Sequence, residues 1–421
     1  MKDIIVQKFG GTSVADTDKI KNVARAVIRE KNLGNDVVVV VSAMGHTTDA
    51  LVKLAKEISP NPSSREMDML LSTGEGVSIA LLAMALQAQG CDAVSMNAMQ
   101  VGIFTEKVHT KARILDIKTD KISKYLEEGK VVVVAGFQGI TDDFEITTLG
   151  RGGSDTSAVA LAGALNAKRC DIYTDVEGVY TTDPRIVPCA SKIKQISYEE
   201  MMELANSGAN VLHPRAVETA ARYSIPVRVR STFKLDDLGT LILGVEQMEV
   251  QRYVTGVALD LSQLRIVVCD VPDNPGTAAM LFDALADENI SVDMIIQSYA
   301  RKIVNTNDIA FTIDKSDLEK AKKVLSDLKE NLGYSSIYVD DKIAKISIVG
   351  AGMIGRPGIA AKMFRTLANT GINIKMIATS EIKVSCLVDE INANEGVKAL
   401  HSVFGLDCDE IAEVKGDLPD V

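Results

Sequence analysis

The segment IIVQKFGGTS, residues 4–13, begins the pattern that indicates the fold of the first half of the chain. Its β-rich residues 4–9 run into two glycines, and an amphipathic segment follows with apolar residues on one helical face at Ile20, Val23, Ala24, Val27 and Ile28. A second buried strand, DVVVVV at residues 36–41, then leads into SAMG. Continuous apolar strands that alternate with amphipathic helices indicate a parallel sheet covered on both faces.

The same alternation continues to about residue 245. Residues 130–135 and 171–174 are predicted as further strands, and Ser197 with Glu200 forms a capping box that opens a helix ending near Gly208. The segment 233–253 is the predicted domain boundary. We therefore expect a first domain at residues 1–245.

The whole-chain composition excludes several classes of protein. The 421 residues are 46% apolar, which suits two or three globular domains. A net charge of −11 argues against a nucleic-acid-binding surface. No apolar run approaches the roughly 18 residues of a membrane helix, and the N-terminus lacks a signal-peptide core. The six scattered cysteines have no metal-ligand spacing and are interpreted as reduced thiols. We expect a cytoplasmic protein without membrane contact.

The second half of the chain contains an internal repeat. Pro275-Gly276 recurs as Pro357-Gly358, an offset of 82 residues (357 − 275 = 82). The same offset aligns Leu285-Ala286 with Leu367-Ala368, Ile290 with Ile372, Met294 with Met376, and Ser298 with Ser380. Each copy is predicted to have a strand, the Pro-Gly turn, an amphipathic helix and a second strand. The pattern indicates a duplicated unit.

Three loops carry residues suited to binding anions. In the first, Lys8 stands at the end of a buried strand, where an unpaired charge is costly, so it needs an anion such as a transferred phosphoryl group. A surface salt bridge is the alternative. Gly10 and Gly11 follow in the strand-to-helix turn, where backbone N–H groups and the helix dipole favour phosphate.

The second loop, LGRGGSDTS at residues 149–157, is predicted to open an apolar helix at residues 158–165. Its three glycines allow close approach of a ligand to the backbone, and Arg151 suits a carboxylate or a phosphate. Ser154 or Asp155 alternatively serves only as the helix N-cap. The third loop, residues 173–185, is rich in Asp, Thr and Tyr and is by itself a weak indication of a nucleotide pocket.

Three common nucleotide-binding signatures are absent from the sequence. It contains no GxxxxGK[ST] loop, no HRD and DFG pair, and no GxGxxG after the first strand. A P-loop enzyme, a protein kinase and a dinucleotide-binding fold are therefore disfavoured.

Taken together, these segments resemble the aspartate kinase family. The match rests on VQKFGGTSV (residues 6–14), SAMG (42–45), STGE (72–75), TTLGRGGSD (147–155) and YTTDPR (180–185), in that family's order and spacing. The duplicated unit resembles a tandem pair of ACT domains. The resemblance implies a three-layer α/β/α kinase domain with a largely parallel sheet, followed by two ferredoxin-like βαββαβ domains, at residues 264–341 and at residues 253–263 with 342–421.

The resemblance also implies the reaction. ATP, as its Mg²⁺ complex, phosphorylates the side-chain carboxylate of L-aspartate to 4-phospho-L-aspartate, the first step towards lysine, threonine and methionine. Lys8 and Asp155 are the expected catalytic residues. The expected ATP-binding residues are Lys8, Gly10, Gly11, Ser42, Thr174, Asp175, Tyr180, Asp183, Pro184 and Arg185. The expected aspartate-binding residues are Thr47, Thr48, Glu75, Arg151, Gly152, Gly153 and Ser154. No protein-bound metal site is expected beyond Mg²⁺ carried by ATP.

The ACT pair implies feedback inhibition by lysine, threonine or both. The expected effector residues are Asp273, Asn274, Pro275, Gly276, Ser291, Val292, Asp293, Gln297, Asn373, Ile374, Ser380 and Glu381. Because the second copy has GMIGR at residues 352–356 where the first has DVPDN, we expect one type of pocket per pair rather than two equal ones.

The ACT pair also implies a homo-oligomer. An internal start near Met248 would give a separate regulatory subunit and an α2β2 assembly. Two alternatives stay open: a related kinase acting on glutamate, carbamate or a nucleotide, and an amino-acid-binding regulatory protein with an inactive kinase domain.

Overall fold

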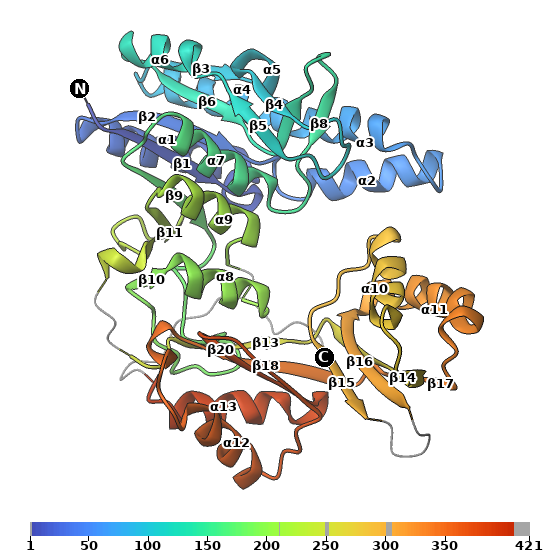
Figure 1. Cartoon of the computed structure of the whole chain (residues 1–421). Helices are drawn as coiled ribbons and strands as arrows, with labels where there is room; N and C mark the ends of the chain where they lie inside the picture. The colour runs from blue at the N-terminus through green and yellow to red at the C-terminus, as the bar shows by residue number, and fades with distance from the viewer. Residues whose placement is uncertain (1, 210, 249–251, 300–304, 408–421) are drawn as a thin grey trace. The chain divides into compact units, whose positions relative to one another are not determined.

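The computed structural model describes residues 2–209, 211–248, 252–299 and 305–407 (Figure 1). These residues form two compact units. The first contains the chain up to Tyr180, Lys192–Asn206 and residues 211–248. The second contains Thr181–Ser191, residues 207–209 and the rest of the C-terminal half.

The first unit is built on an eight-stranded sheet in the order β10-β12-β11-β9-β1-β2-β6-β3. Neighbouring strands are parallel except for β11 and β12, so β10 and β12 run against the other six. The strands are β1 Ile4–Phe9, β2 Asp36–Val41, β3 Ala93–Met96, β6 Val131–Ala135, β9 Arg169–Thr174, β10 Gln195–Ser197, β11 Val227–Ser231 and β12 Thr240–Leu243. The predicted largely parallel sheet is confirmed.

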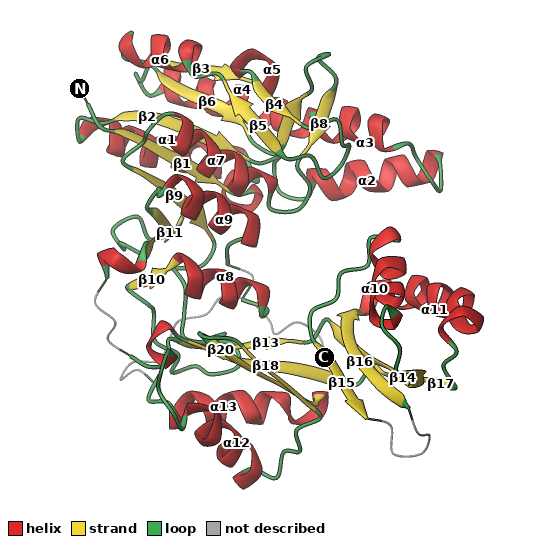
Figure 2. Ribbon diagram, in the orientation of Figure 1, coloured by secondary structure: helices red, strands yellow, loops and turns green. Residues whose placement is uncertain are grey.

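Helices cover both faces of this sheet (Figure 2). Phe9 of β1 and alternate residues of β2 and β6, among them Val39 and Val133, pack in one core with α1 and α4. On the other face α7 packs against β1, β2 and β9, and α9 packs against α7. The helices are α1 Thr17–Asn32, α2 Thr47–Ile58, α3 Ser64–Leu71, α4 Thr73–Ala88, α5 Ala98–Val101, α6 Asp120–Glu127, α7 Gly153–Ala164, α8 Tyr198–Asn206 and α9 Pro214–Tyr223.

A small sheet in the order β5-β4-β7-β8 completes the first unit. Its strands are β4 Ile103–Thr105, β5 Ile114–Ile117, β7 Gln138–Ile140 and β8 Ile146–Thr148. The continuous stretch Ser64–Ala88, formed by α3 and α4, is long and apolar enough to cross a membrane by length and composition alone. It contains the buried carboxylates of Asp68 and Glu75, which accept hydrogen bonds inside the unit. These contacts are those of a core helix.

The second unit contains two antiparallel four-stranded sheets, in the orders β15-β16-β14-β17 and β13-β18-β20-β19. The first sheet packs with α10 and α11 around Leu264, Ile266 and Phe311, and the second packs with α12 and α13. The strands are β13 Gly256–Asp260, β14 Gln263–Pro272, β15 Ile295–Tyr299, β16 Thr306–Asp314, β17 Ser336–Asp340, β18 Ile343–Val349, β19 Met376–Thr379 and β20 Lys383–Asp389. The helices are α10 Thr277–Asp287, α11 Leu318–Leu332, α12 Ile359–Asn369 and α13 Ala393–Val403.

The internal repeat appears as two matching helices. α10 and α12 occupy positions 277–287 and 359–369, which differ by the offset of the sequence repeat. The glycine before each helix is left-handed, with φ 96° at Gly276 and 97° at Gly358. β13 pairs with β18 in the sheet of the second copy. The first copy is therefore an insertion in the sequence between two paired strands of the second copy.

One local prediction needs correction. The helix after the second glycine-rich loop begins at Gly153 rather than at residue 158, because left-handed Gly152 is its N-cap and neither Ser154 nor Asp155 caps it. The described part of the first unit ends at residue 248, within the predicted boundary segment 233–253. This segment also contains a strand that was not predicted, β12, which pairs with β10 and β11 inside the first unit. Its polar flanks concealed the short apolar run Thr240–Leu243.

Candidate active site

Lys8 and Asp155 form an ion pair at one edge of the central sheet. Lys8 lies near the end of β1, and Asp155 lies in the first turn of α7. Lys8 Nζ is 2.5 Å from Asp155 Oδ1, and the two side chains are only 11% and 14% exposed. The anion that the buried lysine required is thus supplied within the protein by Asp155. The pair holds the ammonium group at the carboxyl end of the parallel strands, where open α/β sheets bind ligands.

Glycines bring the surrounding backbone close together. A Cβ on Gly11 would lie 2.9 Å from the carbonyl oxygen of Ala43, so the turns after β1 and β2 pack with no room for a side chain. Gly152, with φ 69°, would place a Cβ 2.3 Å from the side chain of His213. The N-terminus of α7 follows directly, and its free N–H groups and dipole favour an anion.

Glu75 is a buried carboxyl beside these turns. It lies in the first turn of α4 and is 2% exposed. Its Oε1 accepts a hydrogen bond from the backbone N–H of Ala43 at 3.2 Å, whereas Oε2 is buried without a hydrogen-bond partner among the described residues. Burial raises the pKa of Glu75 to about 7, and the Ala43 hydrogen bond opposes this only in part. The group suits a cationic ligand that would satisfy Oε2.

These groups surround one cavity of about 280 Å³. The predicted residues that line it are Lys8, Gly11, Ser42, Thr48, Glu75, Arg151, Gly152, Gly153, Ser154 and Asp155. Ala43, Gly45, Phe137 and Gly150 also line it and were missed as site residues by the sequence analysis. Phe137 follows β6 at the same sheet edge as Lys8, which is the signal that would have indicated it.

Other predicted residues lie outside the lining of this cavity. Thr47 donates its hydroxyl to the carbonyl of Met44. Gly10 N–H donates to the carbonyl of Tyr173 on β9, and Thr174 ends that strand beside Asp175, to which its hydroxyl donates at 3.0 Å. Thr174 and Asp175 therefore lie at the end of the strand next to β1, at the same edge of the sheet as Lys8.

The remaining residues of the third loop are divided between the units. Tyr180 belongs to the first unit, and Asp183, Pro184 and Arg185 belong to the second. The Arg185 guanidinium makes a two-pronged contact with the Asp183 carboxylate, at 3.0 Å from Nε and 2.6 Å from Nη2.

A second, smaller cavity of about 100 Å³ lies in the second unit. Four predicted effector residues line it, namely Asp273, Asn274, Gly276 and Gln297, together with the start of α10. Pro275 lies within the same turn. Thr277, Asn307 and Ile309 also line the cavity and were not predicted.

The other predicted effector residues lie elsewhere in the second unit. Ser291, Val292 and Asp293 precede β15, and Asp293 is paired at 2.5 Å with the buried ammonium of Lys345. Asn373 and Ile374 lie between α12 and β19, and Ser380 and Glu381 lie in the turn before β20.

No group of three or more His, Cys, Asp or Glu side chains is arranged to hold a metal ion within the part of the chain that the structure describes. Mg²⁺ commonly binds through substrate phosphates and one or two carboxylates. The Asp155 carboxylate next to Lys8 fits that requirement for a metal that arrives with a nucleotide.

Comparisons with known proteins agree with this architecture. Residues 3–231 match the amino acid kinase family model, and residues 265–328 and 346–404 match an ACT domain model. An aspartokinase of Bacillus sp. (strain MGA3) is 55% identical over 403 residues, which is 96% of this chain and 97% of that protein.

Two solved structures of one enzyme are similar over nearly the whole chain. E. coli aspartokinase III in complex with aspartate and ADP has a TM-score of 0.81 at 30% identity, covering 95% of this chain and 99% of that one. The same enzyme in complex with lysine and aspartate has a TM-score of 0.76 at 29% identity, covering 96% and 99%.

Proposed function

The chain belongs to the amino acid kinase family and, within it, to the aspartokinases, and on this premise we propose which residues carry the reaction. The enzyme transfers a phosphoryl group from ATP to the side-chain carboxylate of L-aspartate, giving 4-phospho-L-aspartate and ADP. A bond forms between a carboxylate oxygen and the γ-phosphorus, and the bond from that phosphorus to the β–γ bridging oxygen breaks.

The observation that carries the assignment of the site is the convergence of three groups on one cavity. Arg151 offers a guanidinium for a carboxylate of aspartate, and Glu75 offers an unpaired buried oxygen for the ammonium group. Lys8, backed by Asp155, offers a cation for the transferred phosphoryl group. Thr48, Gly152, Gly153 and Ser154 complete the aspartate subsite. Thr47, next to Thr48 in the chain, stays a proposed contact on the basis of the family resemblance.

This arrangement requires positioning more than proton transfer. The nucleophile is a carboxylate with a reference pKa of about 3.9, so it is ionised at neutral pH without a general base. Two anions must approach, and the Lys8 ammonium and the N–H groups at the start of α7 offset their repulsion. We assign Asp155 the task of holding Lys8 and orienting the reactants. Mg²⁺ bound with ATP supplies further charge neutralisation.

We propose that the nucleotide extends from Lys8, Gly10, Gly11 and Ser42 towards the end of β9. Thr174 and Asp175 stand there, next to β1. Tyr180, Asp183, Pro184 and Arg185 remain proposed nucleotide contacts on the strength of the family resemblance.

The test is aspartate-dependent ADP release by the purified full-length chain. We expect turnover with aspartate and none with glutamate or carbamate. Arg151→Lys removes the two-pronged contact with a carboxylate and should raise KM for aspartate by about tenfold or more. Arg222→Lys, at an exposed position on α9, is the matched control and should leave KM unchanged. Turnover with another acceptor would replace aspartate as the substrate, and no turnover with any acceptor would favour the regulatory-protein interpretation.

We propose that the smaller cavity at the start of α10 binds an amino-acid effector. The free N–H groups of the helix suit its carboxylate, and Asp273 suits its ammonium group. Lysine, threonine or both are the effectors to test, added singly and together during turnover. Inhibition that requires both would indicate a concerted site, and loss of inhibition in Gln297→Ala would place the effector in this cavity. Inhibition unchanged by Gln297→Ala would remove the assignment.

The assembly and location of the enzyme are also proposals. We infer a soluble, cytoplasmic homo-oligomer formed through the ACT domains. The proposed domain limits are 1–245 for the kinase domain, 264–341 for one ACT domain, and 253–263 with 342–421 for the other. A second product starting near Met248 would form an α2β2 enzyme. Mass determination of the intact complex distinguishes one chain type from two.

A further inference from the structure

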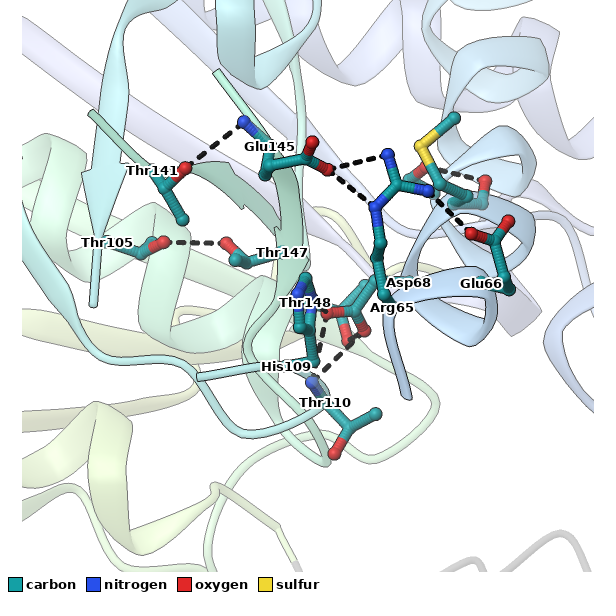
Figure 3. A network of polar contacts seen from close by, with 12 residues as sticks. Arg65, Glu66, Asp68, Thr105, His109, Thr110, Thr141, Glu145, Thr147 and Thr148 are labelled. Atoms are coloured by element: carbon teal, nitrogen blue, oxygen red, sulfur yellow. Dashed lines mark hydrogen bonds and ion pairs between the residues drawn. The ribbon is translucent and has the colours of Figure 1, made fainter. Parts of the chain in front are cut away.

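Asp68 is a buried carboxylate outside the lining of the candidate active site (Figure 3). It lies on α3 and is completely buried. Both of its oxygens accept the backbone N–H of Thr110, at 3.1 and 3.0 Å. Oδ1 also accepts the hydroxyl of Thr148 at 2.6 Å, and Oδ2 lies 2.8 Å from Nδ1 of His109. A buried carboxylate is costly unless such donors satisfy it.

The backbone that Asp68 holds is strained. Thr110 has φ 68°, a left-handed conformation that a β-branched residue rarely adopts. A strained backbone conformation persists only where the surrounding structure imposes it, and such conformations are common at functional sites. Here the hydrogen bond from Thr110 N–H to Asp68 supplies the constraint.

The strained residue lies directly behind the glycine-rich turn of the active site. The carbonyl oxygen of Thr110 would be 2.8 Å from a Cβ on Gly150, which itself has φ 77°. Gly150 begins the turn that carries Arg151, and the Gly153 N–H closes this turn on the Gly150 carbonyl at 2.9 Å. Thr148, held by its hydroxyl, is the last residue of β8 before the turn.

The turn places Arg151 at the cavity. It is exposed, and among the described residues no hydrogen bond or ion pair holds its side chain. The backbone of the turn therefore fixes the position of its Cα, from which the guanidinium reaches the cavity. Misplacing a substrate-binding group by about 1 Å costs up to roughly a hundredfold in activity.

We propose that Asp68, together with Thr148 and His109, is a positioning residue that fixes Arg151 for aspartate binding through the strained Thr110 and the Gly150 turn. This inference rests on the proposed role of Arg151. It predicts that loss of a hydrogen bond to Asp68 weakens aspartate binding and leaves ATP binding nearly unchanged.

The experiment compares two neighbouring threonines of β8 in the full-length enzyme. Thr148→Val removes one hydroxyl donor from Asp68 and should raise KM for aspartate about tenfold, leaving KM for ATP within about twofold. Thr147→Val is the matched control, because the Thr147 hydroxyl pairs with Thr105 at 2.6 Å and not with Asp68. It should leave both KM values within about twofold of wild type.

Two further measurements separate positioning from a merely structural role. In an Arg151→Lys background, Thr148→Val should add less than about twofold to KM for aspartate, because the effect acts through Arg151. His109→Gln, at a partly exposed position, is a milder second variant and should move KM for aspartate in the same direction. KM does not depend on the fraction of folded enzyme, so a loss of stability alone leaves it unchanged.

The proposal would be overturned if Thr148→Val and Thr147→Val raised KM for aspartate equally. It would also be overturned if Thr148→Val still raised KM for aspartate about tenfold in the Arg151→Lys background. Unchanged KM values in both Thr148→Val and His109→Gln would overturn it as well. If the wild-type enzyme turns over aspartate and the variants give any of these contradicting results, only the positioning role is refuted. A wild-type enzyme without aspartate turnover refutes the proposed function first.

Discussion

Replacing Glu75 by glutamine should make the folded enzyme more stable and less able to bind aspartate. Burial raises the pKa of this carboxyl from 4.5 to about 7. At about 1.36 kcal/mol per tenfold change in proton affinity, the charged form costs the folded state about 3 kcal/mol above pH 7. Because the folded pKa lies above the unfolded one, this cost grows as pH rises from 4.5 to about 7.

Glu75→Gln removes the buried charge and keeps an oxygen that accepts from Ala43 N–H. At about pH 8 the free energy of unfolding in urea should therefore rise by up to about 3 kcal/mol, and at about pH 5 by less than about 1 kcal/mol. KM for aspartate at about pH 8 should rise about tenfold or more, since the ammonium group loses its charged partner.

The pH dependence and a control variant make the test specific. In the wild type, KM for aspartate should increase below about pH 7 as Glu75 takes up a proton, and in Glu75→Gln this increase should be absent. Glu200→Gln replaces another buried glutamate, which caps α8 away from the cavity, and should leave KM for aspartate unchanged. A stability gain that is equal in acid and in alkaline buffer, or an unchanged KM for aspartate, would contradict this role of Glu75.

Three other contacts lead to measurable effects. Gly152→Ala should abolish aspartate-dependent ADP release, because its Cβ would meet the His213 side chain at 2.3 Å; activity comparable to wild type would contradict this. Asp155→Asn should reduce kcat without removing a limb of the pH–rate profile below about pH 6, whereas loss of such a limb would identify Asp155 as a base. Lys345→Met leaves the carboxylates of Asp260 and Asp293 without their buried cation. It should lower the free energy of unfolding in urea by about 3 kcal/mol or more. No loss of stability would show that these ion pairs are dispensable.

Much of the fold could be predicted because its signals are local. The run at residues 36–41 is apolar almost throughout because β2 is buried in the middle of the sheet, and the structure has a strand at the same residues. The capping box at Ser197 and Glu200 was predicted from two side chains three residues apart, and both of its hydrogen bonds are present. The internal repeat likewise predicted helices α10 and α12 at equivalent positions.

Strands β10 and β12, which run antiparallel to the other six strands of the sheet, were not predicted. Each has only a few residues and is defined by its pairing with distant segments. Phe137 was missed in the candidate site for a similar reason. No motif marks it, and it reaches the cavity because β6 lies beside β2 in the sheet.

The glycine-rich turns, the lysine at the end of a buried strand and the arginine among glycines could all be recognised in the sequence, because strand burial and backbone freedom are properties of short segments. The tertiary structure determines which charged and polar groups form pairs. Lys8 meets Asp155 across 147 residues of sequence (155 − 8 = 147), and Asp68 meets Thr148 across 80. Such pairings, and the desolvation that raises the pKa of Glu75, depend on the packing of several elements at once, and no local pattern encodes them.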